Sequence, residues 1–312
     1  MFHKLSVVIP VFNEAEIIPT LADRLLKTLN TLHFSYEVIF VDDGSDDEGA
    51  RLLANLSQRE SNVRVLKLSR NFGHQAAVTA GLEQASGDGI VLMDGDLQDI
   101  PEAIPDFVQQ WEAGFDVVYA IRTSRKENWF MQFLFKFFYS LVSKISGVKL
   151  PLNAGIFCLM DRKVCNVLTS LTEHGRYFPG LRAYAGFRQT GIPIDRDARF
   201  AGNPHVKFRG LVQLALDAIF SFSNLPLRLA TYLGTLVASC SFLYLAVVLC
   251  IKIFTSKAIS GWASILGAVL LLGGIQLVML GVVGEYIGRI YEETKRRPYF
   301  VVAEKLNFPQ DS

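Results

Sequence analysis

The stretch that decides the fold of this chain is Ile90-Val-Leu-Met-Asp94-Gly-Asp96-Leu-Gln98-Asp99. Its apolar run from Ile90 to Met93 predicts a buried β-strand, and the strand ends in two carboxylates that are one residue apart. In extended backbone, residues i and i+2 point to the same side, so we expect Asp94 and Asp96 to converge at the end of the strand.

Two carboxylates held this close repel one another unless a cation lies between them. A Mg²⁺ or Mn²⁺ ion on a diphosphate suits such a pair, because these ions take one or two carboxylates together with phosphate oxygens. Gln98 could add a neutral oxygen. The alternative is a solvated turn in which Asp99 caps the helix that begins at Pro101. The Asp-x-Asp pattern alone leaves both interpretations open.

Other predicted strands also end in polar residues. Helices alternate with strands that are expected at residues 5–10, 36–41, 63–68, 90–93 and 115–121. This alternation predicts right-handed βαβ units and a parallel sheet, whose ligands lie beyond the carboxyl ends of the strands. The residues found at those ends are Asn13 and Glu14, Asp42 and Asp43, Arg70, Asp94 and Asp96, and Arg122. Polar groups at five strand ends favour one shared site over unrelated surface turns.

Two common nucleotide-binding motifs are absent from the sequence. No Gly-x-Gly-x-x-Gly follows the first strand, and no Walker loop with its lysine is present. The first loop carries Pro10, Val11 and Glu14 instead. Glu14 could merely be an acid in the first turn of a helix, and Asp42 and Asp43 could merely open a turn. Their alternative role is to accept hydrogen bonds from a nucleoside base and ribose.

Composition narrows the class of protein. The charges of the 31 basic and 30 acidic residues nearly cancel. The chain as a whole therefore lacks the excess of positive charge that is typical of a nucleic-acid-binding protein. Half of the 312 residues are apolar, and the excess lies toward the C-terminus. Four cysteines without metal spacing fit a reducing compartment. No signal peptide precedes the first strand, so the N-terminal domain is expected to stay on the side of its synthesis.

The C-terminal part of the sequence predicts association with a membrane. Residues 127–146 are aromatic almost all round with interspersed lysines, which favours a helix at a membrane surface over a core helix. An apolar helix is expected within 206–226. Residues 229–251 and 263–284 then carry no charge, and each run is long enough to span a bilayer. Basic residues flank both ends of this region, so the positive-inside rule places both termini in the cytoplasm.

Five motifs together resemble one known family. They are Val-Val-Ile-Pro-Val-Phe-Asn-Glu (7–14), Val-Asp-Asp-Gly-Ser (41–45), Ser-Arg-Asn-Phe-Gly (69–73), Asp-Gly-Asp-Leu-Gln-Asp (94–99) and Gly-Glu-Tyr-Ile-Gly-Arg (284–289). The chain resembles the family 2 glycosyltransferases with an A-type fold. Within them it is similar to the polyprenyl-phosphate glycosyltransferases, such as dolichol-phosphate mannosyltransferases and bactoprenol glucosyltransferases. The likeness covers nearly the whole chain and leaves the sugar unspecified.

The resemblance implies an α/β architecture with a mostly parallel, Rossmann-like sheet. Residues 1–205 would form the cytoplasmic domain that binds the nucleotide-sugar, and 206–226 a juxtamembrane helix. Residues 227–290 would form two transmembrane helices, and 291–312 a cytoplasmic tail. This arrangement would place the enzyme in the inner (plasma) membrane as a protein with two spans.

The resemblance also implies residue roles. The nucleotide-sugar would be bound by Pro10, Val11, Glu14, Asp42, Asp43, Arg70, Asp94 and Arg199. Mg²⁺ or Mn²⁺ would be held by Asp94, Asp96 and Gln98. The acceptor phosphate would meet Arg122, Arg125, Arg199 and His205. The residues expected to act directly in catalysis are Asp94, Asp96 and Arg122.

Two residues depart from the family pattern. Many relatives carry an aspartate, proposed as a catalytic base, where this chain has Ile156, and often a lysine where it has His205. A phosphate nucleophile ionises near pH 6 and needs no general base, so we expect activity to be retained. What the reaction needs is correct positioning and charge stabilisation on the leaving diphosphate.

The expected activity is transfer of one sugar, with inversion, from a UDP- or GDP-sugar to a polyprenyl phosphate such as undecaprenyl phosphate. A homo-oligomer and a downstream flippase are further expected partners, and nucleic acid is not. One alternative is a pseudo-transferase or scaffold that binds nucleotide-sugar, which Ile156 favours. The other is a processive polysaccharide synthase, against which the chain lacks Gln-x-x-Arg-Trp.

Overall fold

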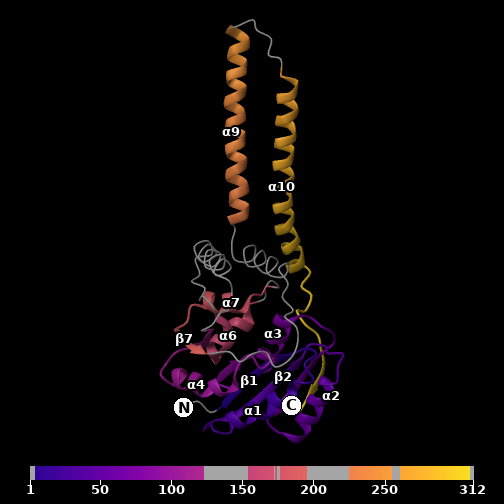
Figure 1. Cartoon of the computed structure of the whole chain (residues 1–312), viewed down its shortest axis with the longest axis vertical. Coiled ribbons are helices and arrows are strands. Elements are labelled where there is room, and N and C mark those ends of the chain that lie inside the picture. The colour runs from indigo at the N-terminus through magenta and orange to yellow at the C-terminus, as the bar shows by residue number, and fades with distance from the viewer. Residues whose placement is uncertain are drawn as a thin grey trace. The chain divides into compact units, whose positions relative to one another are not determined.

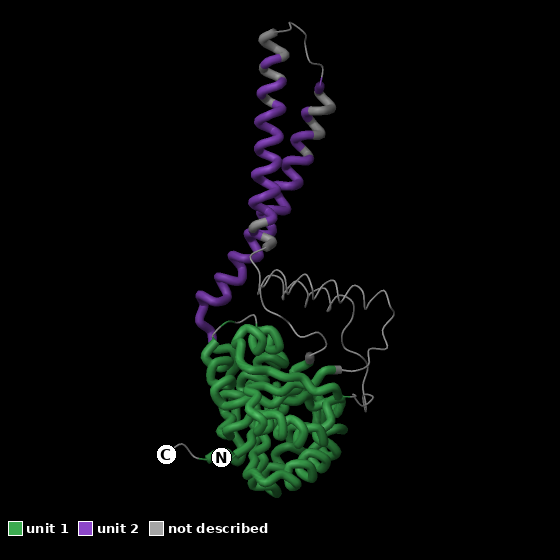
Figure 2. The backbone as a smooth tube through the Cα atoms, turned by 90° about the vertical axis from the view of Figure 1, so that its left-hand side faces the viewer, with its two compact units in different colours: residues 1–207, 298–312 green, residues 208–297 purple. Residues whose placement is uncertain are grey.

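The computed structural model describes residues 4–122, 154–171, 173, 176–194, 225–254 and 261–309. The chain forms two compact units, shown in Figure 2: residues 1–207 with 298–312, and residues 208–297. The predicted surface helix at 127–146 and residues 206–224 of the predicted juxtamembrane helix lie outside the described part. So do Arg125, Arg199, His205 and the side chain of Arg122.

The first unit contains alternating strands and helices (Figure 1). Its elements are β1 (Lys4–Val11), α1 (Ile18–Leu29), β2 (Ser35–Asp42), α2 (Gly49–Arg59), β3 (Val63–Leu68), α3 (His74–Gln84), β4 (Gly89–Leu92), η1 (Pro101–Ala103), α4 (Ile104–Glu112), β5 (Val117–Arg122), β6 (Ala154–Asp161), α6 (Arg162–Ser170), α7 (Phe178–Ala185), β7 (Gln189–Ile194) and β8 (Val302–Leu306).

One sheet with the strand order β7-β5-β6-β4-β1-β2-β3-β8 organises this unit. Strands β1 to β5 and β7 run in the same direction, whereas β6 and β8 are antiparallel to their neighbours. The predicted mostly parallel α/β sheet is therefore confirmed. The carboxyl ends of β1 to β5 meet at one edge, as the positions of the polar residues indicated.

Helices pack on both faces of the sheet. Leu5, Val7 and Ile9 of β1 belong to the core that also contains α1 and α4 residues, and Val8 faces α3 on the other side. Helix α3 can lie this close only because it carries Gly81. A Cβ at that position would overlap the Val8 side chain, in an interior that is already close-packed. The close packing brings the first residues of α3 beside the strand ends.

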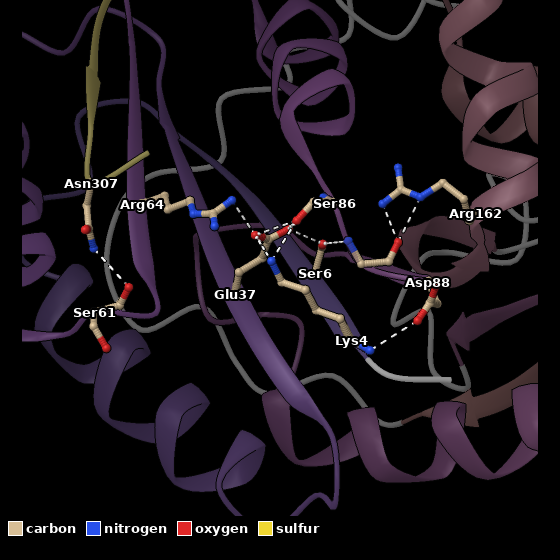
Figure 3. Close-up of polar contacts among 10 residues, drawn as sticks. Lys4, Ser6, Glu37, Ser61, Arg64, Ser86, Asp88, Arg162 and Asn307 are labelled. Atoms are coloured by element: carbon tan, nitrogen blue, oxygen red, sulfur yellow. Dashed lines mark hydrogen bonds and ion pairs between the residues drawn. The ribbon is translucent and has the colours of Figure 1, made fainter. Parts of the chain in front are cut away.

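A buried carboxylate links the amino ends of the strands (Figure 3). Glu37 of β2 is 1% exposed and pairs with Lys4 of β1 at 2.7 Å and with Arg64 of β3 at 2.5 Å. Ser6 donates its hydroxyl to Glu37, and the backbone N–H of Ser86, just before β4, donates at 2.7 Å. The Glu37 side chain thus connects β1, β2, β3 and the segment just before β4. This cluster lies at the amino edge of the sheet, opposite the carboxyl ends of the strands that carry the polar residues.

The C-terminal segment is part of the sheet. The sequence predicted a polar tail from residue 291, but the last helix continues to Thr294, and β8 pairs antiparallel with β3. The Asn307 side chain then donates to the carbonyls of Ser61 at 3.1 Å (drawn in Figure 3) and Val63 at 2.7 Å. Both ends of the second unit therefore connect to the first unit.

The second unit is a helical hairpin of α9 (Leu225–Phe254) and α10 (Trp262–Thr294), which run side by side in Figures 1 and 2. Large apolar side chains are exposed on both helices, among them Phe242 and Leu277. By length and composition, one helix within the described residues could cross a membrane, Leu271–Thr294, and Leu229–Tyr244 is a shorter apolar helix. The prediction of two spans stays a prediction.

Candidate active site

A pocket of about 440 Å³ opens at the carboxyl edge of the sheet. Four strand ends contribute to it, and its lining residues are Pro10, Val11, Phe12, Glu14, Asp43, Asn71, Gly73, His74, Ala77, Asp94, Gly95 and Asp96. Six of the residues that the sequence singled out therefore meet in one place. Because four of the lining side chains are carboxylates, which repel an anion, a cation bound beside it would favour an anionic ligand here.

The loop after β4 shapes the acidic end of the pocket. The backbone N–H of Asp94 donates to the Asp99 carboxylate at 3.2 Å, and the N–H of Gln98 donates to Asp96 at 3.1 Å. Between them Leu97 has a φ of 58°, a conformation that is sparsely populated by non-glycine residues and often found at functional sites. The loop thus folds back on itself and presents Asp94 and Asp96 to the pocket.

The structure shows where two further predicted residues of this loop, Asp99 and Gln98, lie. Asp99 is 2% exposed and accepts the backbone N–H of Asp94, and the residue at the N-cap of η1 is Ile100, which makes no side-chain capping bond. The turn is therefore not solvated at Asp99, and the N-cap position of η1 belongs to Ile100. Gln98, predicted as a metal ligand, does not line the pocket, and its hydrogen bond to Asp96 is made by its backbone.

His74 is a site residue that the sequence analysis missed. It is the first residue of α3, and its Nε2 lies 2.9 Å from Oδ1 of Asp94. Burial alone would lower the pKa of His74, but the hydrogen bond and charge of Asp94, with Asp43 and Asp96 nearby, raise the pKa above its ordinary value. Among the described residues that line this pocket, His74 has the one side chain that can carry a positive charge. Its position one residue beyond the Ser-Arg-Asn-Phe-Gly motif was the available signal.

Asp43 lies in the pocket and holds a neighbouring loop. Its carboxylate accepts from the N–H groups of Phe72 at 2.8 Å and Gly73 at 2.9 Å. Burial raises the pKa of Asp43, although these two hydrogen bonds oppose the shift. Gly44 has a φ of 72°, and a Cβ there would lie 2.5 Å from the Arg70 backbone, so the two loops touch directly.

Asp42 faces a different side of the sheet. It is 1% exposed and lines a neighbouring groove of about 800 Å³ rather than the pocket that holds Asp43. Its Oδ1 accepts from the N–H of Ser45 at 2.9 Å, and its Oδ2 has no hydrogen-bond partner in the described part of the chain. The sequence treated the two aspartates as one nucleoside-binding pair, which the structure separates.

Of the arginines predicted to bind phosphate or nucleotide-sugar, the structure describes Arg70 and the backbone of Arg122. Arg70 is exposed beside the pocket, where its guanidinium stacks 4.0 Å from the Phe72 ring centroid and donates to the Asn71 carbonyl. Arg122 ends β5 at the same edge of the sheet, which is the position that the sequence predicted. Ile156, at the departure from the family pattern, lies on β6 and is 9% exposed.

The residues present fit a divalent cation that is shared with a ligand. Within the described ranges, no group of three or more His, Cys, Asp or Glu side chains could hold a metal ion by itself. Asp94 and Asp96 offer oxygen ligands, which suit Mg²⁺ and Mn²⁺. These ions often use one or two carboxylates and complete their coordination with phosphate oxygens and water.

Comparison with known proteins gives a consistent assignment. The model of glycosyl transferase family 2 matches residues 6–169, and the model of the GtrB C-terminal hairpin matches residues 225–290. An uncharacterized glycosyltransferase of Synechocystis is 43% identical over 305 residues, which is 97% of this chain and 96% of that protein. A bactoprenol glucosyl transferase of Shigella phage SfV is 39% identical over 302 residues, with 96% and 98% covered.

Solved structures agree on the fold. Glucosyl-3-phosphoglycerate synthase from Mycobacterium tuberculosis, in complex with Mn²⁺, UDP and phosphoglyceric acid, superposes with a TM-score of 0.52. The sequences are 19% identical, and the match covers 70% of this chain and 76% of that chain. At this level of identity the likeness is evidence for the architecture of the sheet domain.

Proposed function

Because the chain belongs to glycosyl transferase family 2, we propose that it transfers a single sugar from a UDP- or GDP-sugar to a polyprenyl phosphate. The observation that carries the proposal is the acidic pocket around Asp94 and Asp96, found in a chain that matches a bactoprenol glucosyl transferase over nearly its whole length. Bactoprenol is a polyprenyl alcohol, so its phosphate is the acceptor that this likeness favours.

The geometry supports a direct displacement. Pro10, Val11, Asp43, Asp94 and Asp96 all line the pocket. In this proposal the first three would contact the nucleoside, and Asp94 and Asp96 would lie at the diphosphate. An oxygen of the acceptor phosphate would attack C1 of the sugar as the bond from C1 to the diphosphate oxygen breaks, which inverts the anomeric carbon. A bound Mg²⁺ or Mn²⁺ would offset the charge of the departing diphosphate, and Asp94 and Asp96 are the residues that would hold it.

The chain can dispense with a general base near Ile156. A phosphate monoester is largely in its dianionic form at neutral pH, because its second pKa lies near about 6. Such a nucleophile has no proton that must be removed before attack. The buried, apolar Ile156 is therefore compatible with activity, and it counts less in favour of the pseudo-transferase alternative.

We expect Ile156→Asp to change the rate of transfer by less than about tenfold, which corresponds to about 1.4 kcal/mol. The physical reason is that an added base has no proton to remove. Initial rates with a fixed donor and acceptor check this expectation, and Ile156→Asn controls for introducing a polar group at a buried position. A large gain with aspartate, but not with asparagine, would contradict the mechanism.

Connectivity supports a membrane hairpin with two spans. Strand β8 is hydrogen-bonded to β3, so the chain leaves the sheet domain before α9 and returns to it after α10. A segment that starts and ends on the same domain must cross a membrane an even number of times. The exposed apolar surfaces of α9 and α10 favour two crossings over none. The basic flanks then favour a cytoplasmic catalytic domain at the inner membrane.

The test uses membranes that contain the full chain, with Mg²⁺, undecaprenyl phosphate and a panel of UDP- and GDP-sugars. Mass analysis of the lipid fraction is expected to show one added sugar from one donor. Products with several added sugars would instead favour a processive synthase. Absence of product from every donor, with nucleotide binding intact, would favour the pseudo-transferase.

A further inference from the structure

The proposed displacement leaves one pocket residue, His74, without a role. His74 is the first residue of α3, and its Nε2 lies 2.9 Å from Oδ1 of Asp94, which is 20 residues later in the chain. The side chains are 45% and 26% exposed, respectively. Because an ionised carboxylate can only accept hydrogen bonds, Nε2 of His74 carries a hydrogen and donates it. A proposed metal ligand on one loop therefore has a hydrogen-bond donor on a different element.

The backbone that carries His74 is held in place by a second pocket acid. The Asp43 carboxylate accepts from the N–H groups of Phe72 at 2.8 Å and Gly73 at 2.9 Å. Gly73 has a φ of 96°, which glycine adopts readily and which lets the chain turn from this loop directly into α3. The helix then begins with the N–H of Ala76 donating to the Gly73 carbonyl at 2.9 Å. The backbone on the N-terminal side of His74 is thus fixed by hydrogen bonds.

Helix α3 itself is firmly packed on the sheet. Every residue from Ala76 to Leu82 is buried, and a Cβ at Gly81 would overlap a side chain of β1. A side chain on such an element is placed more precisely than one on a loop. The start of α3 therefore connects Asp43, proposed to contact the nucleoside, with Asp94, proposed to hold the cation.

A fixed carboxylate matters for the proposed chemistry. Mg²⁺ requires nearly ideal octahedral geometry, so an aspartate that binds it must present its oxygen in one orientation. Asp94 lies in a pocket with three other carboxylates, whose repulsion favours orientations that turn them apart when no cation is present. Carboxylates that bind metals are usually held by hydrogen bonds from neighbouring groups. The donor on His74 meets this requirement for Asp94.

We propose that His74 is a positioning residue that holds the Asp94 carboxylate in the orientation that binds a divalent cation on the nucleoside diphosphate. It acts through the hydrogen bond from Nε2, and the start of α3 sets the distance between the acid at the nucleoside and the acid at the cation. The inference rests on the proposed function of the pocket as a nucleotide-sugar site.

Three substitutions of His74 test the role of this hydrogen bond. His74→Ala removes the donor. His74→Gln places an amide NH₂ group near the position of Nε2, whereas the shorter side chain in His74→Asn places it near Nδ1, out of reach of Asp94. Binding of UDP and of GDP to the full chain in detergent is measured by calorimetry, with and without Mn²⁺.

The expected result is a loss that appears only with the metal. Substitutions of groups that hold metal ligands typically weaken metal binding 10–100-fold, so we expect at least about a tenfold loss of Mn²⁺-dependent nucleotide affinity in His74→Ala and His74→Asn. His74→Gln should recover most of this affinity. Nucleotide affinity without metal should be the same in all three variants and the unsubstituted protein.

Other outcomes would overturn the proposal. Unchanged Mn²⁺-dependent affinity in His74→Ala would show that the hydrogen bond does not support the cation. Equal losses with and without Mn²⁺ would show that His74 contacts the nucleotide directly.

Thermal unfolding distinguishes positioning from a merely structural role. Because His74 is partly exposed, the unfolding midpoints of the three variants should lie within about 2 °C of the unsubstituted protein. Losses of affinity that follow losses of thermal stability would overturn the proposal. If the unsubstituted protein binds neither nucleotide, the proposed function itself fails, which is a distinguishable outcome.

Discussion

Replacing Asp94 with asparagine is expected to lower the initial rate of sugar transfer by about 10²–10³-fold, the usual effect of removing one electrostatic group from a transition state. Asparagine has nearly the same shape, and its backbone N–H can still donate to Asp99. In the proposed mechanism, the substitution removes a negative charge that would hold a divalent cation on the diphosphate. The substitution also affects the contact with His74, whose Nε2 lies 2.9 Å from Oδ1 of Asp94. In one of its two amide orientations, the asparagine would place an NH₂ group there instead of an acceptor oxygen.

The measurement is the initial rate of formation of the lipid-linked sugar at several concentrations of Mg²⁺ or Mn²⁺. Asp106→Asn is the matched control, because Asp106 is exposed in the first turn of α4, away from the pocket-lining residues. The control should transfer at the rate of the unsubstituted protein. If the Asp94→Asn variant keeps both the transfer rate and its dependence on the metal concentration, other residues must hold the metal. If the rate depends on no metal in either protein, the mechanism has no metal-dependent step.

The sheet was predictable because its signals are local. The apolar run at residues 90–93 became β4 (Gly89–Leu92), and the run at 63–68 became β3 with the same bounds. Polar residues directly after such runs identified the edge where the pocket forms. A strand of a parallel sheet that is buried on both faces must be apolar throughout, so its end is visible in the sequence without knowledge of its neighbours.

Strand β8 was not predictable by the same means. Its residues, Val302 to Leu306, include a glutamate and a lysine and lie at the edge of the sheet with mostly exposed side chains. Its partner β3 is more than 200 residues earlier in the chain, and the helical hairpin of α9 and α10 separates the two. Nothing in a short polar segment indicates which distant edge it pairs with, because edge pairing relies on backbone hydrogen bonds.

The separation of Asp42 from Asp43 could have been predicted. Side chains alternate along a strand, so Asp42 must face the same side as Phe40, which belongs to the core beneath α1. Asp43, one residue later, then turns toward α3 and the pocket. Arg182 is the opposite case, since a fully buried arginine contradicts the usual location of charged residues and has no signature in the sequence.

The largest expected effect on stability is that of Glu37→Gln. Glu37 is buried between Lys4 and Arg64, and removal of its charge leaves two cations without their counter-ion at the amino ends of three strands. Breaking a buried ion pair in this way typically costs about 3–5 kcal/mol. For a domain of this size, a loss of about 3 kcal/mol lowers the unfolding midpoint by about 6–12 °C. Thermal unfolding of the full chain in detergent measures the shift.

Glu102→Gln is the matched control for this substitution. Glu102 forms an ion pair with Arg24 at 2.8 Å, but the Glu102 side chain is 50% exposed. Exposed pairs contribute about 0–1 kcal/mol because water screens them, so the midpoint of this variant should fall by no more than about 4 °C. Equal shifts in the two variants would show that loss of a glutamate charge, rather than its burial between strands, determines the effect.

The dependence on pH distinguishes the charge of Glu37 from its packing. Burial alone would raise the pKa of Glu37, but hydrogen bonds from Lys4, Ser6 and Ser86 lower it below the ordinary value of about 4.3. A pKa that is lower in the folded than in the unfolded chain adds stability above the unfolded pKa, and this stability is lost as the pH falls through the folded pKa. The midpoints of the unsubstituted protein and Glu37→Gln should therefore differ most near pH 7 and converge as the pH falls below about 4. A difference that persists undiminished in acid would mean that the substitution disturbs the packing between β1 and β3, and that the ion pairs contribute little.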